Sequence, residues 1–358
     1  MGLETDSLDL WQVMNMRNSK VVDLTLDEDC YDMYPKKNRE FATQRFRYGY
    51  SSMVTPPSTY EYDMTSGTKH LLKEQEVPLY DRSLYRTERL FATARDGTKV
   101  PISLVYHTGC KYARLKQPAP MMLYAYGSYG ICIDPSFDSK CISYLDRGMI
   151  FAIAHIRGGG EMGRHWYESE GKYLKKMNTF TDFCDCAEFL ITSGYTRASE
   201  LAISGRSAGG LLMGSVLNLR PDLFQTAVAG VPFVDIMVTM SDPSIPLTIT
   251  EWEEWGNPNE KKYHDYMLAY SPVDNVKRNK YPSLLITAGL NDPRVPYWEP
   301  AKWVARLRDA QTDKSAPMLL KTDMSSGHFS ASDRYKLWEE RSIEFAFVAA
   351  QLGCQQLL

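Results

Sequence analysis

The pattern of hydrophobic and polar positions divides the chain near residue 80. Before that point, hydrophobic and polar residues alternate in short segments that are separated by polar turns every eight to twelve residues. This period of two predicts antiparallel strands, about six of them, which are too few to close a barrel or a propeller. The predicted strand segments are LWQVMNM (10–16), VVDLTL (21–26), FRYGYSSMV (46–54), TYEYDM (59–64) and HLLKEQEV (70–77).

After residue 80 the pattern changes to hydrophobic runs that alternate with helical periodicity. A strand pair is predicted around the turn Asp96-Gly97, since this dipeptide is a strong hairpin signal. Nearly continuous hydrophobic strands separated by helices are typical of a mostly parallel, doubly wound sheet covered on both faces, so an α/β fold is predicted. Its strands are expected at 120–127, 148–156, 201–205, 226–232, 283–289 and 317–322, and its helices at 178–193, 207–219, 298–310 and 332–352.

The segment Gly205-Arg206-Ser207-Ala208-Gly209 follows one of these strands and opens a helix. A Gly-x-Ser-x-Gly pattern in this position is typical of a nucleophile elbow, in which a serine occupies a sharp, strained turn. Ser207 is therefore the candidate nucleophile. The alternative is that Ser207 only caps the helix that follows it.

A serine nucleophile needs a base and a carboxylate that orients the base, in the chain order Ser, Asp, His for this fold. His328 follows the strand at 317–322 in a polar loop, whereas His264 lies in a charged segment of helical pattern. Asp292 follows the strand at 283–289, at the end of the sheet where active-site residues collect. We predict a triad of Ser207, Asp292 and His328, although Asp292 alone is also compatible with a plain turn and His328 with an idle loop residue.

An oxyanion hole needs two hydrogen-bond donors aimed at the developing negative charge. The backbone N–H of Ala208, which follows the nucleophile, is one candidate. The second donor is expected from the loop YAYGSYG (124–130), which follows an early strand. This chemistry requires no metal and no cofactor.

Composition and charge narrow the choice of partners. The 41 basic residues are offset by 44 acidic residues, no basic run stands out, and no run of 18 apolar residues occurs, so neither a nucleic acid nor a membrane is an expected partner. The N-terminal segment MGLETDSLDLWQ lacks the basic and apolar regions of a secretory signal. Seven cysteines show no framework spacing, which favours reduced thiols and a cytoplasmic location.

Five segments, in this order, resemble the prolyl oligopeptidase family and its oligopeptidase B branch between about residues 85 and 353. The resemblance implies an α/β-hydrolase catalytic domain at 81–358, preceded at 1–80 by the last strands of a partial β-propeller. It implies a serine endopeptidase that cleaves short basic peptides after Arg or Lys. The segments are YAYGSYG (124–130), HIRGGGEMGRHWYESEG (155–171), GRSAGG (205–210), EWEEWGNP (251–258) and NDPRVPYWEP (291–300).

The resemblance also implies roles for single residues. Tyr126 matches the tyrosine whose hydroxyl is the second oxyanion donor, and Arg294 matches a residue that binds a substrate carbonyl or orders the site. Glu251 and Glu253 match the acidic pair that selects a basic side chain, which is chemically reasonable because a carboxylate pairs well with a guanidinium. Phe233 would stack on the guanidinium plane.

The sequence departs from the family pattern in two ways. The branch carries two acidic residues for a second basic side chain, and here Asp134 is present but Ser136 occupies the other position. Most of the propeller is also missing. The resemblance therefore does not extend to a preference for a dibasic pair. Two other functions also remain open: an esterase of the same fold, since the fold does not decide the substrate, and a catalytically silent chain that acts by binding.

Overall fold

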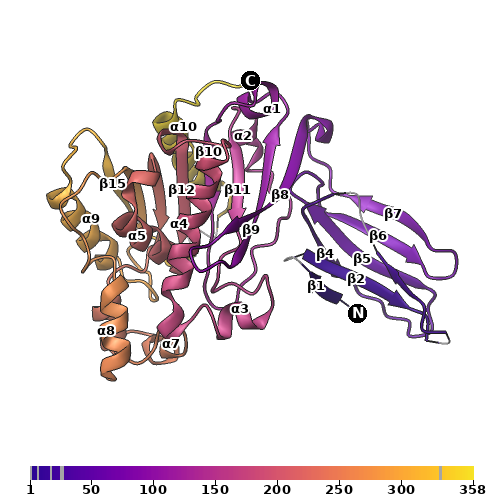
Figure 1. Cartoon of the computed structure of the whole chain (residues 1–358), viewed down its shortest axis with the longest axis horizontal. Coiled ribbons are helices and arrows are strands. Elements are labelled where there is room, and N and C mark those ends of the chain that lie inside the picture. The colour runs from indigo at the N-terminus through magenta and orange to yellow at the C-terminus, as the bar shows by residue number, and fades with distance from the viewer. Residues whose placement is uncertain (1, 6–7, 17, 25–27, 330–332) are drawn as a thin grey trace.

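The computed structural model describes residues 2–5, 8–16, 18–24, 28–329 and 333–358 (Figure 1). The end of the predicted strand at 21–26 and the first residue of the predicted helix at 332–352 lie outside these residues. Within them, the strands form three sheets of three, four and eight strands. No helix in the described part of the chain is both long enough and apolar enough to cross a membrane.

The eight-stranded sheet has the order β15-β14-β13-β12-β10-β11-β9-β8. Neighbouring strands are parallel from β15 to β11, whereas β9 and β8 form the antiparallel hairpin predicted around Asp96-Gly97. The predicted α/β fold class is thereby confirmed. The strands are β8 (Tyr85–Thr93), β9 (Lys99–His107), β10 (Met121–Tyr124), β11 (Ile150–Ala154), β12 (Leu201–Arg206), β13 (Thr226–Gly230), β14 (Ser283–Gly289) and β15 (Met318–Asp323).

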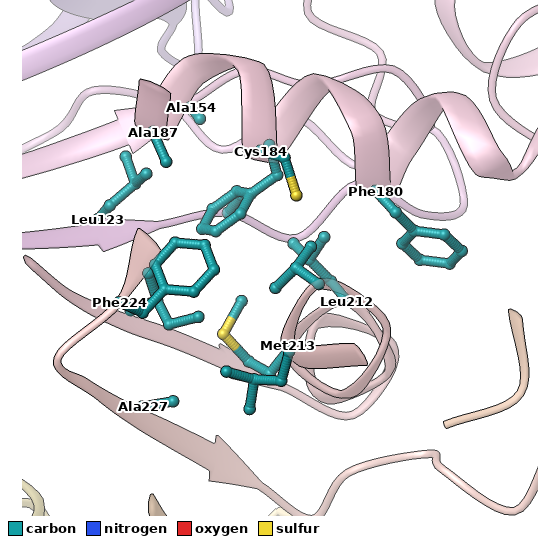
Figure 2. Packing of buried hydrophobic residues seen from close by; sticks show 14 of the residues in the cluster. Leu123, Ala154, Phe180, Cys184, Ala187, Leu212, Met213, Phe224 and Ala227 are labelled. Atoms are coloured by element: carbon teal, nitrogen blue, oxygen red, sulfur yellow. The ribbon is translucent and has the colours of Figure 1, made fainter. Parts of the chain in front are cut away.

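Helices cover both faces of this sheet because successive side chains of a strand point to opposite sides. Leu123 of β10 packs in a cluster with residues of α4, α5 and α9, and Figure 2 shows the part of it around α4 and α5. The preceding residue, Met122, packs in a second cluster with residues of α2 and α10. These helices are α2 (Ile142–Leu145), α4 (Met177–Thr192), α5 (Ala208–Leu219), α9 (Trp298–Ala310) and α10 (Arg334–Leu352).

Several further short helices lie in the connections between the strands. Of these, only α8 lies in a segment whose pattern was noted as helical, the one that contains His264. The most important is α7, which contains most of the acidic segment 251–258. They are α1 (Lys111–Leu115), α3 (Arg164–Glu168), α6 (Ile236–Ser241), α7 (Thr248–Trp255) and α8 (Lys261–Tyr270), with 3₁₀ turns η1 (Arg82–Leu84), η2 (Tyr173–Lys175), η3 (Ala198–Glu200) and η4 (Pro221–Leu223).

The N-terminal strands form two antiparallel sheets that lie to the right of the larger sheet in Figure 1. Met53 and Val54 contact the larger part of the molecule, where they pack with Tyr85 and Val105 in a small cluster. The three-stranded sheet holds β1 (Gly2–Thr5), β2 (Leu8–Met14) and β3 (Val21–Asp23), and the four-stranded sheet holds β4 (Tyr31–Pro35), β5 (Arg45–Ser52), β6 (Ser58–Asp63) and β7 (Thr68–Glu74).

Candidate active site

Ser207 lies at the sharp turn between β12 and α5. Its φ of 58° and ψ of −117° lie in a region that side-chain-bearing residues rarely adopt. The turn is tight enough that a Cβ on Gly205 would lie 2.2 Å from the carbonyl oxygen of Gly209, so glycine is required there. The backbone N–H of Ser207 donates to Gly230 at 2.8 Å, and this bond ties the turn to the neighbouring strand.

The structure brings the three predicted triad residues into one chain of hydrogen bonds. His328 Nε2 lies 2.9 Å from Ser207 Oγ, and His328 Nδ1 lies 2.7 Å from Asp292 Oδ2. The other oxygen of Asp292 accepts the backbone N–H groups of Arg294 at 2.8 Å and Val295 at 2.9 Å. A carboxylate held in this way accepts the Nδ1–H of the imidazole and leaves Nε2 as the acceptor for the serine hydroxyl.

Arg206 holds the loop that carries the histidine. Its Nη2 donates to the carbonyl oxygen of His328 at 2.6 Å. The sequence marked Arg206 only as part of the GRSAGG motif and did not reveal this role, because the two residues are 122 positions apart. The residue beside the nucleophile therefore also orients the base.

A cavity of about 500 Å³ opens beside Ser207. Seven of the nine predicted site residues line it. Asp292 does not line the cavity, but it is hydrogen-bonded to His328, which does. The cavity also holds residues that the sequence did not single out, among them Tyr129 and Trp255. The seven predicted residues that line it are Tyr126, Ser207, Ala208, Phe233, Glu251, Arg294 and His328.

Both predicted oxyanion donors face this cavity. Ala208 is the first residue of α5, so its backbone N–H has no acceptor within the helix. Burial raises the pKa of Tyr126 to about 12, so its phenol keeps its proton, and remains a donor, throughout the neutral range. The two groups are suited to stabilising an oxyanion formed at Ser207.

Glu251, on α7, is the carboxylate in this cavity. Its Oε2 accepts hydrogen bonds from the Tyr129 hydroxyl at 2.7 Å and from Trp255 Nε1 at 3.0 Å. Among the described residues, none donates a hydrogen bond to its Oε1. Phe233 lies against the same wall, with its ring centroid 5.4 Å from that of Trp255. Glu251 therefore combines a fixed position with an oxygen that remains available to a cationic ligand.

The structure does not bring Glu253 to the cavity. Glu253 is exposed and accepts a hydrogen bond from the Tyr173 hydroxyl at 3.0 Å. The reason is helical geometry, since residues two apart on an α-helix point about 200° apart. The acidic pair expected from the sequence is thus one cavity residue and one surface residue in this structure.

Arg294 also lines the cavity, with its guanidinium carbon 5.1 Å from the centroid of the Phe329 ring. Asp134 and Ser136 do not line this cavity. They border a separate hollow of about 370 Å³, which shares Tyr124 and Arg206 with the cavity beside Ser207. Within the described residues, no group of three or more His, Cys, Asp or Glu side chains could hold a metal ion.

Comparisons with protein families match both parts of the chain. A profile of the prolyl oligopeptidase family matches residues 135–355, and a profile of the prolyl oligopeptidase N-terminal β-propeller domain matches residues 5–75. Among curated relatives, dipeptidyl aminopeptidase BI of Pseudoxanthomonas mexicana is 50% identical over 91% of this chain and 45% of its own length. Protease 2 of Moraxella lacunata is 44% identical over 97% of this chain and 50% of its own length.

Solved structures give the same picture. Oligopeptidase B from Leishmania major superposes with a TM-score of 0.91 at 49% identity, covering 100% of this chain and 50% of that one. Oligopeptidase B from Trypanosoma brucei, with covalently bound antipain, superposes with a TM-score of 0.91 at 53% identity, covering 100% of this chain and 51% of that one. The chain therefore spans about half the length of the relatives it matches.

Proposed function

The chain belongs to the prolyl oligopeptidase family, and we propose that it is a serine peptidase that cleaves short peptides after arginine or lysine. The observation that carries this proposal is the presence of Glu251 in the cavity that also holds Ser207 and His328. A carboxylate in a partly enclosed cavity, lined in part by aromatic side chains, favours a cationic side chain over a neutral one of similar shape.

In the proposed reaction, a basic side chain enters the cavity and donates a hydrogen bond to Glu251, and Phe233 stacks on the plane of an arginine guanidinium. His328 Nε2 takes the proton of Ser207 while Oγ attacks the carbonyl carbon of the basic residue, at the bond to the next residue. Asp292 stabilises the imidazolium that forms. The Ala208 N–H and the Tyr126 hydroxyl donate to the carbonyl oxygen as it becomes negatively charged.

The attack of Ser207 Oγ gives a tetrahedral intermediate, and the collapse of this intermediate breaks the peptide bond. His328 gives its proton to the leaving amine, and the acyl group stays esterified to Ser207 Oγ. A water molecule then transfers a proton to His328 and attacks the ester carbonyl, which releases the acid and returns the proton to Ser207. Arg294, which also lines the cavity, would bind a backbone carbonyl of the peptide or order the site.

The experiment that tests the function compares arginyl and citrullyl amides of the same blocked peptide. Citrulline keeps the shape of arginine but carries no charge, so the ratio of the two kcat/KM values measures the electrostatic part of the selectivity. We expect the arginyl substrate to be preferred by about a hundredfold. Turnover of short-chain esters without this preference would instead indicate an esterase, and a folded chain that turns over none of them would indicate a binding protein.

A second comparison separates two modes of cleavage. The relative from P. mexicana is named as a dipeptidyl aminopeptidase, an enzyme class that requires a free amino terminus, whereas we propose an endopeptidase. A dipeptidyl arginyl amide with a free amino group and the same compound with a blocked one distinguish these modes. Equal or better cleavage of the blocked compound supports the endopeptidase.

The location proposed for this activity is the cytoplasm. All seven cysteines of the chain fall within the described residues, and each is a free thiol. Five of them are buried, which agrees with a protein that keeps its thiols reduced.

A further inference from the structure

A buried ion pair outside the reacting atoms joins the Tyr126 loop (residues 125–130) to helix α7. The Lys176 side chain is almost completely buried, and its Nζ donates to three acceptors: Gly127 O at 2.7 Å, Ser128 Oγ at 2.7 Å and Glu254 Oε1 at 3.2 Å. An ammonium group has three N–H donors, so all of them are used. Lysine is rarely buried to this degree, and a buried ion pair is weak evidence for a stabilising role.

Tyr129 connects Glu254 to Glu251, the carboxylate proposed to select the basic side chain. Its backbone N–H donates to Glu254 at 3.2 Å, and its hydroxyl donates to Glu251 at 2.7 Å. Glu251 and Glu254 are three residues apart on α7 and so lie on neighbouring positions of one helix face. Tyr129 also has a φ of 60°, which is unfavourable for an aromatic residue unless its surroundings hold it there.

Glu254 is enclosed from the other side as well. Its Oε2 accepts the hydroxyl of Tyr167 at 2.6 Å, and Lys176 Nζ lies 4.9 Å from the centroid of the Trp255 ring, whose N–H reaches Glu251. Figure 1 shows α3, which carries Tyr167, at the same end of the molecule as α7. The contacts of this pair therefore lead to the Tyr126 loop on one side and to Glu251 on the other.

We propose that Lys176 and Glu254 are positioning residues that lock the Tyr126 loop onto α7 and thereby fix the oxyanion donor Tyr126 relative to the specificity carboxylate Glu251. The proposal rests on the proposed peptidase function and deepens it. This one buried pair would then influence both the rate of the chemical step, which depends on Tyr126, and the preference for a basic side chain, which depends on Glu251.

Loss of the Lys176–Glu254 pair has an expected kinetic consequence that a change at Tyr126 or at Glu251 alone does not have. If the loop moves relative to α7, a bound arginine no longer places its carbonyl oxygen at the oxyanion donors. A displacement of about 1 Å at a reacting centre costs about a hundredfold in rate. Loosening the lock is thus expected to lower kcat and the arginyl-over-citrullyl ratio together, whereas removing the Glu251 charge acts mainly on the ratio.

The test uses the double variant Lys176→Met/Glu254→Gln, which removes both charges and leaves no unpaired one buried. We expect kcat on the arginyl amide to fall about tenfold to a hundredfold and the arginyl-over-citrullyl ratio to fall about tenfold. The matched control is Arg95→Met/Asp185→Asn, which removes the ion pair between Arg95 and Asp185 of α4, neither of which lines the cavity. The control should keep kcat and the ratio within about twofold. A folded double variant with wild-type kcat and ratio overturns the proposal.

Two further measurements keep the proposal testable under other outcomes. Hydrogen exchange of the backbone amides of residues 125–130 needs no substrate, and it should be faster in the double variant than in the wild type or the control. If the double variant does not fold, Tyr129→Phe replaces it, because this change removes only the hydroxyl that reaches Glu251. It should lower the ratio about tenfold with a smaller effect on kcat, and an unchanged ratio overturns the link. Absence of arginyl turnover in the wild type counts against the proposed function, while loop exchange still decides the positioning role.

Discussion

The eight-stranded sheet and the four-stranded sheet β4–β7 bury their strands in different ways. Every residue of β13, in the middle of the larger sheet, is buried, because helices cover both faces. By contrast, no residue of β7 is fully buried, and this strand has a neighbour on one side only among the described strands. The comparison teaches that the nucleophile occupies the enclosed region, because Ser207 follows β12, a strand with a neighbour on each side, whereas none of the predicted site residues lies on β7.

The largest expected effect follows from removing one oxygen at the end of β12. Ser207→Ala should lower kcat/KM on the arginyl amide by at least about a thousandfold, because in a triad the loss of the serine removes most of the chemical acceleration. Unfolding followed by circular dichroism should show no loss of stability. A variant that retains more than about one part in a thousand of the activity contradicts the assignment of the nucleophile.

A smaller effect is expected from the two carboxylates on α7. Glu251→Gln should reduce the arginyl-over-citrullyl ratio by about tenfold to a hundredfold, because the charge match in the cavity is lost. Glu253→Gln is the matched control, since Glu253 is exposed and faces Tyr173. It should change the ratio by less than about threefold. Equal losses in the two variants show that both carboxylates contact the substrate and that the cavity rearranges when it binds.

The free energy of unfolding should also depend on pH through a carboxyl group that is buried in the larger part of the molecule. Glu299 is completely buried and accepts hydrogen bonds from Val234 and Asp235 at 2.9 Å each, and its burial raises the pKa to about 7. In the unfolded chain this carboxyl titrates near pH 4.3. Its contribution to stability is therefore fully present below about pH 4 and is lost as the pH rises to about 7.

Glu299→Gln removes this titration, so the variant should lose less stability than the wild type between pH 5 and pH 7.5. Thermal midpoints measured at several pH values check the difference. The value at pH 5 supplies the internal control, because there the wild-type carboxyl is protonated and resembles the amide. Parallel pH profiles of the two proteins contradict a raised pKa at this position.

The smallest expected effect lies on the outer strand. Leu72 is about half exposed on β7, so Leu72→Lys should change the free energy of unfolding by less than about 0.5 kcal/mol and leave the arginyl kcat/KM unchanged. A lysine on an edge strand disfavours pairing with another chain, so self-association at high concentration should decrease. Sedimentation velocity measures this change, and a loss of activity in the variant shows that β7 affects the cavity.

Much of the larger sheet and of the site could be predicted because its signals are local. Continuous hydrophobic runs marked the strands, and Ser207, Asp292 and His328 each follow a strand of the parallel sheet. The segment at 251–258 was different. Its letters suggested a pair of acids, but whether both face one cavity depends on the helical conformation of α7, which the sequence did not reveal. Glu253 consequently lies outside the cavity.

The residues that the sequence missed act through contacts between distant parts of the chain. Arg206 reaches the carbonyl of His328, and Lys176 reaches Glu254 78 positions away. No pattern of hydrophobic and polar residues encodes such a pair, since each partner looks like an ordinary surface residue in its own segment. Tyr129 had one available signal, its place in the motif YAYGSYG, but the role of its hydroxyl depends on α7.

At the strained turn of Ser207, thermal stability and catalysis favour different residues. Glycine adopts a φ of 58° without the penalty that a side chain incurs. A library of variants screened only for survival at high temperature should therefore collect glycine at position 207 and lose its activity in the same step. Stabilising substitutions should therefore be sought at other positions, because at position 207 the residue that best stabilises the fold is not the residue that the reaction requires.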